Sequence, residues 1–206
     1  MEKRGLDNLS ITIIAALVAL DFFVWYQIIF LQPKANPELH FLDVGQGDGT
    51  LLVLPGDIEI LTDAGPDRKV TRSIEKVIAS GDKYIDLAVI SHPQLDHFNG
   101  FNDLLMRYDF GAFIINGRTD AAAKAEWNAL IEAIKTKNIP LITLGRGDRI
   151  RYGENIIEIL SPDEGWLQSG ELNDTGIVEL IKTSQFTALL TADIGVNIEE
   201  ELVEKY

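Results

Sequence analysis

Two of the three histidines of the chain stand close together, with an aspartate beside them. Residues 91–97 read Ser-His-Pro-Gln-Leu-Asp-His and directly follow a near-continuous apolar run. Neutral imidazoles and a carboxylate are ligands that suit zinc, manganese or iron. In the alternative interpretation, His92 and His97 are polar turn residues and Asp96 caps a following helix. The spacing alone leaves both interpretations open.

Three other strand-like segments deliver an acid near the point where they end. Asp43 and Asp48 flank a glycine-rich turn, whereas Asp63 and Asp193 each follow an apolar run. Taken singly, each acid is typical of a turn or a helix cap. Together with the histidines they predict a cation site, because a bound cation would offset the converging carboxylates.

These side chains need strands and helices to position them. Helical spacing predicts helices over 70–79 and 121–137 and from 196 to 206. Apolar runs between glycine and proline turns predict strands at 39–44, 50–54, 58–62, 85–91, 141–143, 148–151, 156–160, 176–181 and 186–191. Strand runs open and close the domain with helices between them, so we expect an α/β fold with a mixed sheet or two sheets covered by helices.

The N-terminal part of the chain has a different composition. Residues 11–31 are apolar except for Thr12, Asp21 and Gln27, and about 20 such residues are enough to cross a bilayer. A cleaved signal peptide is the rival interpretation, but it would normally have a shorter apolar region and a small-residue cleavage site. We therefore predict an uncleaved signal anchor at residues 10–32, after a short cytoplasmic tail of residues 1–9.

Flanking charges predict the orientation of this anchor. Lys3 and Arg4 precede the apolar segment and Lys34 follows it, so the positive-inside bias favours a cytoplasmic N-terminus. The chain would then cross the cell membrane once, with residues 33–206 as one domain outside the cytoplasm. The prolines at 33 and 37 end the helix in a short linker.

Composition excludes several functions for residues 33–206. They carry 16 basic and 29 acidic side chains, so a general electrostatic footprint for coating nucleic acid is excluded. The chain has no cysteine, which excludes a disulfide partner, a thiol nucleophile and a cysteine-rich zinc site.

The motifs, taken in order, resemble those of the metallo-β-lactamase-fold hydrolases. The resemblance is closest to the ComEC-type branch, which includes the extracytoplasmic domain of the competence DNA-uptake channel. Residues 41–48 (Phe-Leu-Asp-Val-Gly-Gln-Gly-Asp) match the opening of this branch, and residues 61–65 (Leu-Thr-Asp-Ala-Gly) look like its second turn. Residues 91–97 align with the metal motif His-x-(His or Asp)-x-Asp-His, and residues 190–193 resemble the strand that bears a bridging aspartate.

The resemblance implies an αββα sandwich with one or two metals at one edge of the sheets. By position, His92 would belong to the first metal site, Asp96 and His97 to the second, and Asp193 would bridge them. Asp96 would also be catalytic, because it would orient the attacking water. The expected metal is Zn²⁺ or Mn²⁺, held as one ion rather than two.

Four further residues would surround these ligands. Asp63 would hold a ligand histidine in place, and Asp43 would lie nearby in the opening motif. Gln94 stands where the family has a His or Asp ligand, and Asn173 matches the segment where this branch has Asn or Asp. The family continues beyond residue 206 into a histidine-rich turn, so we expect the domain to be incomplete at its C-terminus.

Two functions remain open at this stage. One is a membrane-anchored hydrolase that cleaves a phosphodiester or nucleic acid outside the cytoplasm, as in DNA uptake. The alternative is a catalytically degenerate module that keeps the fold and binds a partner, because Gln94 is a weak ligand. Ordinary β-lactam hydrolysis is disfavoured by Gln94 and by the ComEC-like opening.

Overall fold

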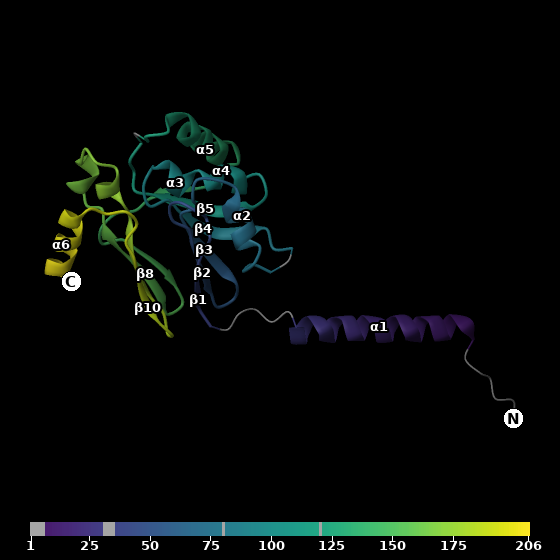
Figure 1. Ribbon diagram of the computed structural model, residues 1–206. Coiled ribbons are helices and arrows are strands. Elements are labelled where there is room, and N and C mark those ends of the chain that lie inside the picture. Colours follow the sequence, from purple (N-terminus) through teal and green to yellow (C-terminus); the bar gives the residue numbers. More distant parts are fainter. Residues whose placement is uncertain (1–6, 31–35, 80, 120) are drawn as a thin grey trace, which may run out of the picture. The chain divides into compact units, whose positions relative to one another are not determined.

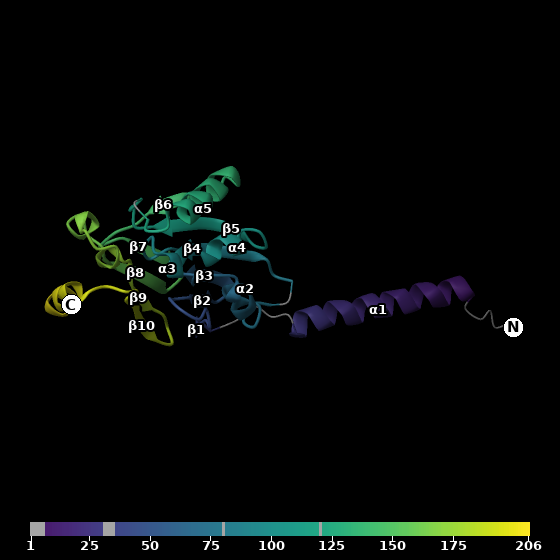
Figure 2. The same ribbon diagram turned by 45° about the horizontal axis from the view of Figure 1, so that its top comes forward.

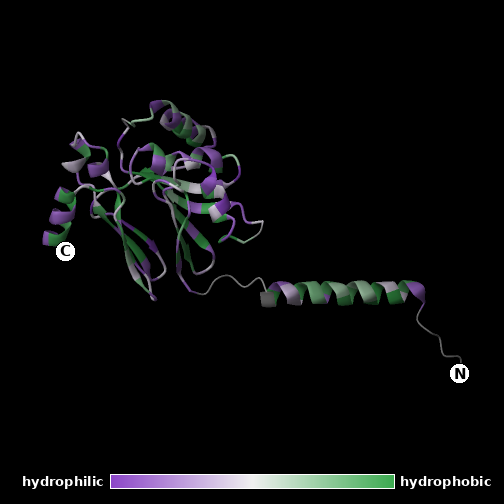
Figure 3. Ribbon diagram, viewed as in Figure 1, coloured by the Kyte–Doolittle hydropathy of each residue, from purple (hydrophilic) through white to green (hydrophobic). Residues whose placement is uncertain are grey.

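The computed structural model describes residues 7–30, 36–79, 81–119 and 121–206 and divides into two compact units, residues 1–34 and 35–206. The first unit contains helix α1 (Asn8–Phe30), whose span Asn8–Ile28 is long and apolar enough to cross a membrane. None of that span is buried against protein, and Figure 3 shows it hydrophobic along most of its length. Helix α1 is therefore a candidate membrane span. The charges at 3, 4 and 34, on which the predicted orientation rests, lie outside the described residues.

The second unit begins with a six-stranded mixed sheet in the order β1-β2-β3-β4-β5-β6. The first three strands are antiparallel, and β3 to β6 run parallel. The carboxyl ends of these four strands therefore share one edge, where α/β proteins place their functional residues. The strands are β1 (Glu38–Phe41), β2 (Thr50–Leu54), β3 (Ile58–Thr62), β4 (Tyr84–Val89), β5 (Asp109–Ile115) and β6 (Leu141–Thr143).

A four-stranded antiparallel sheet packs against the first sheet, in the order β10-β9-β8-β7. Its strands are β7 (Arg149–Tyr152), β8 (Asn155–Ser161), β9 (Val178–Lys182) and β10 (Thr187–Leu190). The chain then ends in helix α6 (Val196–Lys205), which lies outside this sheet, as Figures 1 and 2 show.

The other helices lie on the outer face of the six-stranded sheet (Figure 1). They are α2 (Lys69–Ile74), α3 (Leu95–Phe98), α4 (Gly100–Leu104) and α5 (Lys124–Thr136), and two short 3₁₀ turns, η1 (Trp166–Gln168) and η2 (Asn173–Thr175), connect β8 to β9. The order of layers is helix, sheet, sheet, helix. The predicted αββα sandwich is therefore confirmed.

Alternation along the strands builds a separate core in each space between layers. Leu61 of β3 packs under the helices, whereas its neighbour Ile60 packs between the two sheets. On β9, Ile181 faces the same space between the sheets, and Val178 packs under α6 instead. This period of two is the expected pattern for a sheet that is buried on both faces.

The sequence-based elements differ from the structure in several places; the short helices α3 and α4, for example, were not predicted. Strand β5 was not predicted, although it is central to the six-stranded sheet. The helix expected over 70–79 ends at Ile74 and continues only as hydrogen-bonded turns. The strand expected over 85–91 ends at Val89, because the Ser91 amide donates to the side chain of Asp63 rather than to a neighbouring strand.

Candidate metal centre

The two histidines of the 91–97 segment come together at the carboxyl edge of the six-stranded sheet. His92 lies just after β4, and His97 lies one turn later on α3. Both side chains are fully buried, and their ring centroids are 4.2 Å apart. Imidazoles that are buried this close to each other are unusual as turn residues, which favours the metal-ligand interpretation.

Ser91 fixes which nitrogen of His92 carries the proton. The Ser91 hydroxyl donates to Asp63 Oδ2 at 2.6 Å, so its oxygen is free to accept from His92 Nδ1 at 2.9 Å. Burial, followed by the charge of His97, lowers the pKa of His92 to about 4, so the ring is neutral near pH 7. A neutral ring with its proton on Nδ1 presents a bare lone pair on Nε2.

Asp63 also orients His97. Its Oδ2 lies 2.9 Å from His97 Nδ1, which leaves Nε2 pointing at Asp193 Oδ2 at 3.3 Å. Burial by itself would lower the pKa of His97. The carboxylates of Asp63, Asp193 and Asp48 outweigh that effect and raise the pKa to about 9.

Asp193 reaches the site from the other sheet. It follows β10 across Ala192, which has a φ of 48°. Asp63 has a φ of 57°. A left-handed backbone conformation is unfavourable for a residue other than glycine. Residues in this conformation are concentrated at functional sites. Unlike the histidines, the Asp193 side chain is 45% exposed.

The donor atoms of His92, His97 and Asp193 fit a metal ion. One ligand atom from each residue lies within 4.8 Å of the others. Among the described residues, His92 Nε2 is buried with no hydrogen-bond partner, and a buried lone pair without a partner is costly unless it coordinates an ion. Two imidazoles and a carboxylate form a ligand set that suits a catalytic zinc or manganese ion.

A second group of possible ligands contains Asp48, which the sequence analysis counted among the converging acids but to which it assigned no ligand role. Asp48 lies with Asp63 and His97 at mutual ligand-atom distances within 4.8 Å. Burial, followed by the charge of Asp63, raises the pKa of Asp48. Its position as the terminal acid of the glycine-rich turn was the signal that could have identified it.

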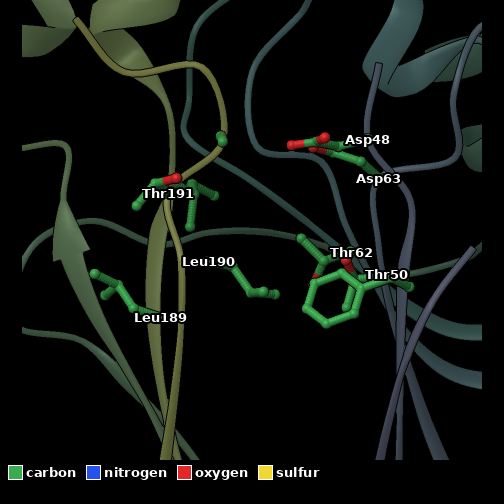
Figure 4. A pocket seen from close by; sticks show the side chains of 10 residues that line it. Asp48, Thr50, Thr62, Asp63, Leu189, Leu190 and Thr191 are labelled. Carbon is green, nitrogen blue, oxygen red and sulfur yellow. The ribbon is translucent and has the colours of Figure 1, made fainter. Parts of the chain in front are cut away.

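A cavity of about 150 Å³ opens beside this second group. Asp48, Asp63, Thr50 and Thr62 form one wall, and Thr191 and the two preceding leucines form the other, as Figure 4 shows. The two walls come from different sheets, so the cavity lies at the open edge of the sandwich.

Asp96 lies beside the histidines, although it is not part of either ligand group. Its Oδ1 is 4.0 Å from His97 Nε2, and its Oδ2 accepts from Gln46 Nε2 at 3.1 Å. A Cβ added to Gly47 would lie 1.8 Å from the Asp96 carbonyl oxygen, so only glycine allows the turn to approach so closely. The metal-binding and water-orienting roles of Asp96 stay predictions.

The structure also gives hydrogen-bond partners to the other predicted residues, which are Gln94, Asn173 and Asp43. Gln94 donates its side-chain amide to Asn173 Oδ1, which joins the His92 loop to η2. Asp43 is exposed, and its backbone carbonyl accepts from Ser73 of α2. Ser91, which the sequence analysis did not select, is the residue that links Asp63 to His92.

Comparisons with known proteins identify the fold. No family model and no curated protein sequence matches the chain. Among solved structures, a metallo-β-lactamase from Cronobacter sakazakii with a HARLDQ motif has a TM-score of 0.51 and 18% identity, over 77% of this chain and 61% of the other. CmlA, a diiron β-hydroxylase from Streptomyces venezuelae, has a TM-score of 0.50 and 15% identity, over 97% of this chain and 38% of the other.

This chain has the metallo-β-lactamase fold. It spans about 44–63% of the length of the β-lactamases reported among its matches, and at such low identity the match extends to the fold alone. CmlA is a diiron β-hydroxylase and the Cronobacter protein is a metallo-β-lactamase, so this one fold supports different chemistries in the proteins that the chain resembles.

Proposed function

We propose that the domain is a metal-dependent hydrolase in which His92, His97 and Asp193 hold one Zn²⁺ or Mn²⁺ ion. The observation that carries the proposal is the fully buried Nε2 of His92, which has no partner among the described residues and lies beside His97. When bound, such an ion lowers the pKa of water to near 7 and polarises the scissile bond.

The protein's own residues would do the rest of the work. Asp63 and Ser91 hold both imidazoles with their Nδ1 atoms turned away from the site. The Nε2 of His92 is then bare, whereas the Nε2 of His97 would bind the ion once it releases the proton that its raised pKa retains near pH 7. Asp96, held by Gln46, would accept a proton from the attacking water and orient it.

The proposed substrate is a phosphodiester, and the proposed relationship within the fold is to the ComEC-type branch. Support for an anionic substrate comes from Arg68, Lys69 and Arg72, which line a cavity of about 390 Å³ on α2 together with two aspartates. The Lys69 ammonium lies 2.9 Å from where a Cβ of Gly45 would be. Gly45 precedes Gln46, so the Lys69 ammonium flanks the turn that contacts Asp96. This positive charge would attract a phosphate despite the negative net charge of the domain.

A specific observation favours the alternative of a catalytically degenerate binding module. Gln94 occupies the position where the family has an ionisable ligand, and its amide is engaged by Asn173. A neutral amide in that bond adds no negative charge to the metal centre, so the ion would be held by fewer charged donors.

We also propose that α1 anchors the protein in the cell membrane, with its N-terminus inside and the domain outside the cytoplasm. The length and hydropathy of Asn8–Ile28 support an anchor. Protease added to intact cells should remove the domain, whereas a cytoplasmic domain would be protected.

Hydrolysis by the full chain in detergent, loaded with Zn²⁺ or Mn²⁺, tests the function. We expect release of nitrophenol from bis(p-nitrophenyl) phosphate and no turnover of nitrocefin. Asp96→Asn should lower kcat while the metal stays bound, and Asp109→Asn, at the start of β5, is the matched control that should not. Bound metal without any turnover would support the degenerate module, and absence of bound metal would refute the hydrolase and leave a degenerate module that binds a partner without metal.

A further inference from the structure

Two polar residues face each other across the space between the sheets. Thr62 is the last residue of β3, and its hydroxyl donates to Glu179 Oε2 of β9 at 2.7 Å. Glu179 is 1% exposed, and its Oε1 has no hydrogen-bond partner among the described residues. A carboxyl in this position costs free energy that an apolar residue would not.

Apart from Thr62 and the nearby charge of Asp63, the surroundings of Glu179 are apolar. Residues of the same inner face pack between the sheets, including Ile177 and Ile181 on either side of Glu179. Burial, which is the largest influence, raises the pKa of Glu179 to about 7. The hydrogen bond to Thr62 is therefore a polar contact inside a space that the sequence otherwise fills with aliphatic side chains.

The location of this bond relates it to both halves of the metal centre. Thr62 directly precedes Asp63, which holds His97 and Ser91. Glu179 pairs in register with Leu190 of β10, and Asp193 follows three residues later. The bond therefore connects β3, which ends beside Asp63, with β9. Strand β9 in turn pairs with β10, which leads to Asp193.

A second connection lies farther along the same edge. The Asn116 amide donates to the Thr175 carbonyl at 2.7 Å, and the Ile177 amide donates to the Ser91 carbonyl at 3.0 Å. These bonds join the ends of β4 and β5 to the segment before β9. The Thr62–Glu179 bond instead joins β3 to β9, the strand that pairs with β10.

We propose that Thr62 and Glu179 are positioning residues that set the spacing between the two sheets where Asp193 meets His92 and His97. This inference rests on the proposed metal centre. Metal ligands must be held to within about 0.5 Å. Packing of aliphatic side chains is less directional than a hydrogen bond, so it defines such a distance less closely.

Zinc affinity of the full chain in detergent tests the proposal, measured by competition with a chromophoric chelator. Thr62→Val and Glu179→Leu remove the bond, and we expect each to weaken Zn²⁺ binding at least 10-fold. Glu179→Gln and Thr62→Ser keep an acceptor and a donor, and should stay within 3-fold of the wild type. Ile181→Ala, two residues along β9 on the same inner face, is the matched control for a loss of packing and should also stay within 3-fold.

A second measurement separates failure of this inference from failure of the metal site. The chain has three histidines, so their imidazole NMR signals can be assigned individually in the metal-free protein. We expect Thr62→Val, which keeps the side-chain shape, to shift the signals of His92 and His97 and to leave His40 unchanged. If the wild type binds no zinc, the proposed function fails and these shifts still test the positioning.

Either of two results would overturn the inference. In the first, folded Thr62→Val and Glu179→Leu proteins match the wild type in zinc affinity and in both imidazole signals. In the second, Ile181→Ala perturbs zinc affinity as much as they do, which would reduce the Thr62–Glu179 bond to ordinary packing.

Discussion

The two halves of the candidate metal centre are built differently. On the six-stranded sheet, His92, His97, Asp63 and Ser91 are buried and joined by hydrogen bonds of 2.6–2.9 Å. On the four-stranded sheet, Asp193 is 45% exposed and lies 3.3 Å from His97. The histidine half is preorganised, whereas the aspartate half depends on how the sheets are spaced.

This difference separates two properties of the protein. Residues of the histidine half should contribute to both stability and metal binding, because their buried side chains are joined to one another by hydrogen bonds through Asp63 and Ser91. Asp193 should contribute to metal binding with little effect on stability. Substitutions on the two sides therefore have distinguishable outcomes.

The largest effect is expected from Asp63→Ala. The substitution leaves His97, the Ser91 hydroxyl and the Ser91 amide buried without their acceptor. Removing one member of such a buried charged network costs about 3–5 kcal/mol. Urea denaturation of the metal-free protein measures the loss, and a loss below about 1 kcal/mol would contradict a preorganised histidine half.

Glu179 should make stability depend on pH. Burial raises its pKa from the ordinary 4.5 to about 7, so the folded state holds this proton more tightly than the unfolded state. The contribution to stability is complete below about pH 4.5 and is lost as the pH rises to about 7, by about 3 kcal/mol in all. Denaturation midpoints at pH 5 and pH 8 should therefore differ more in the wild type than in Glu179→Gln, and equal differences would refute the prediction.

Gly47→Ala should disturb the turn that contacts Asp96. Gly47 has a φ of 75°, and the added Cβ would meet the Asp96 carbonyl oxygen. We expect a cost of about 1–3 kcal/mol from strain and overpacking. Gly153→Ala is the matched control, because its φ of 59° is also positive but nothing lies within 4 Å of the added Cβ. An equal cost at both positions would show that the close approach to Asp96 contributes nothing.

The smallest effect on stability is expected from Asp193→Ala. The side chain is partly exposed, and its hydrogen-bond partner among the described residues is His97 at 3.3 Å, so the free energy of unfolding should change by about 1 kcal/mol or less. The same variant should lose metal binding by more than the roughly 10–100-fold typical of residues that only support a ligand. A large loss of stability would mean that the two halves are built alike.

The fold was largely predictable because its strands are short apolar runs between glycine and proline turns. The predicted ranges of β2, β3 and β6 match the structure. Strand β5 was not predicted because it begins with Asp109 and because Gly111 interrupts its apolar pattern. Gly111 is required there, since a Cβ would lie 2.5 Å from the Asp86 carbonyl oxygen, and that contact depends on strand pairing rather than on local sequence.

The candidate site was predictable only where its residues form a local pattern. His92, Asp96 and His97 are close in sequence, and Asp63 and Asp193 each end an apolar run. Ser91 and Glu179 have no such signal. Their roles arise from partners that are distant in sequence, such as Thr62 for Glu179, 117 residues away, so they follow from the packing of the two sheets.

Metal content is the measurement that tests the central claim most directly. The full chain should be purified without chelator, in parallel with His92→Gln and Asp193→Ala, and analysed by elemental mass spectrometry. We predict about one zinc or manganese ion per wild-type chain and a loss in both variants, because each removes one of only three ligands. A wild-type protein without metal, or an ion retained in both variants, would contradict the assignment of His92, His97 and Asp193 as the metal centre.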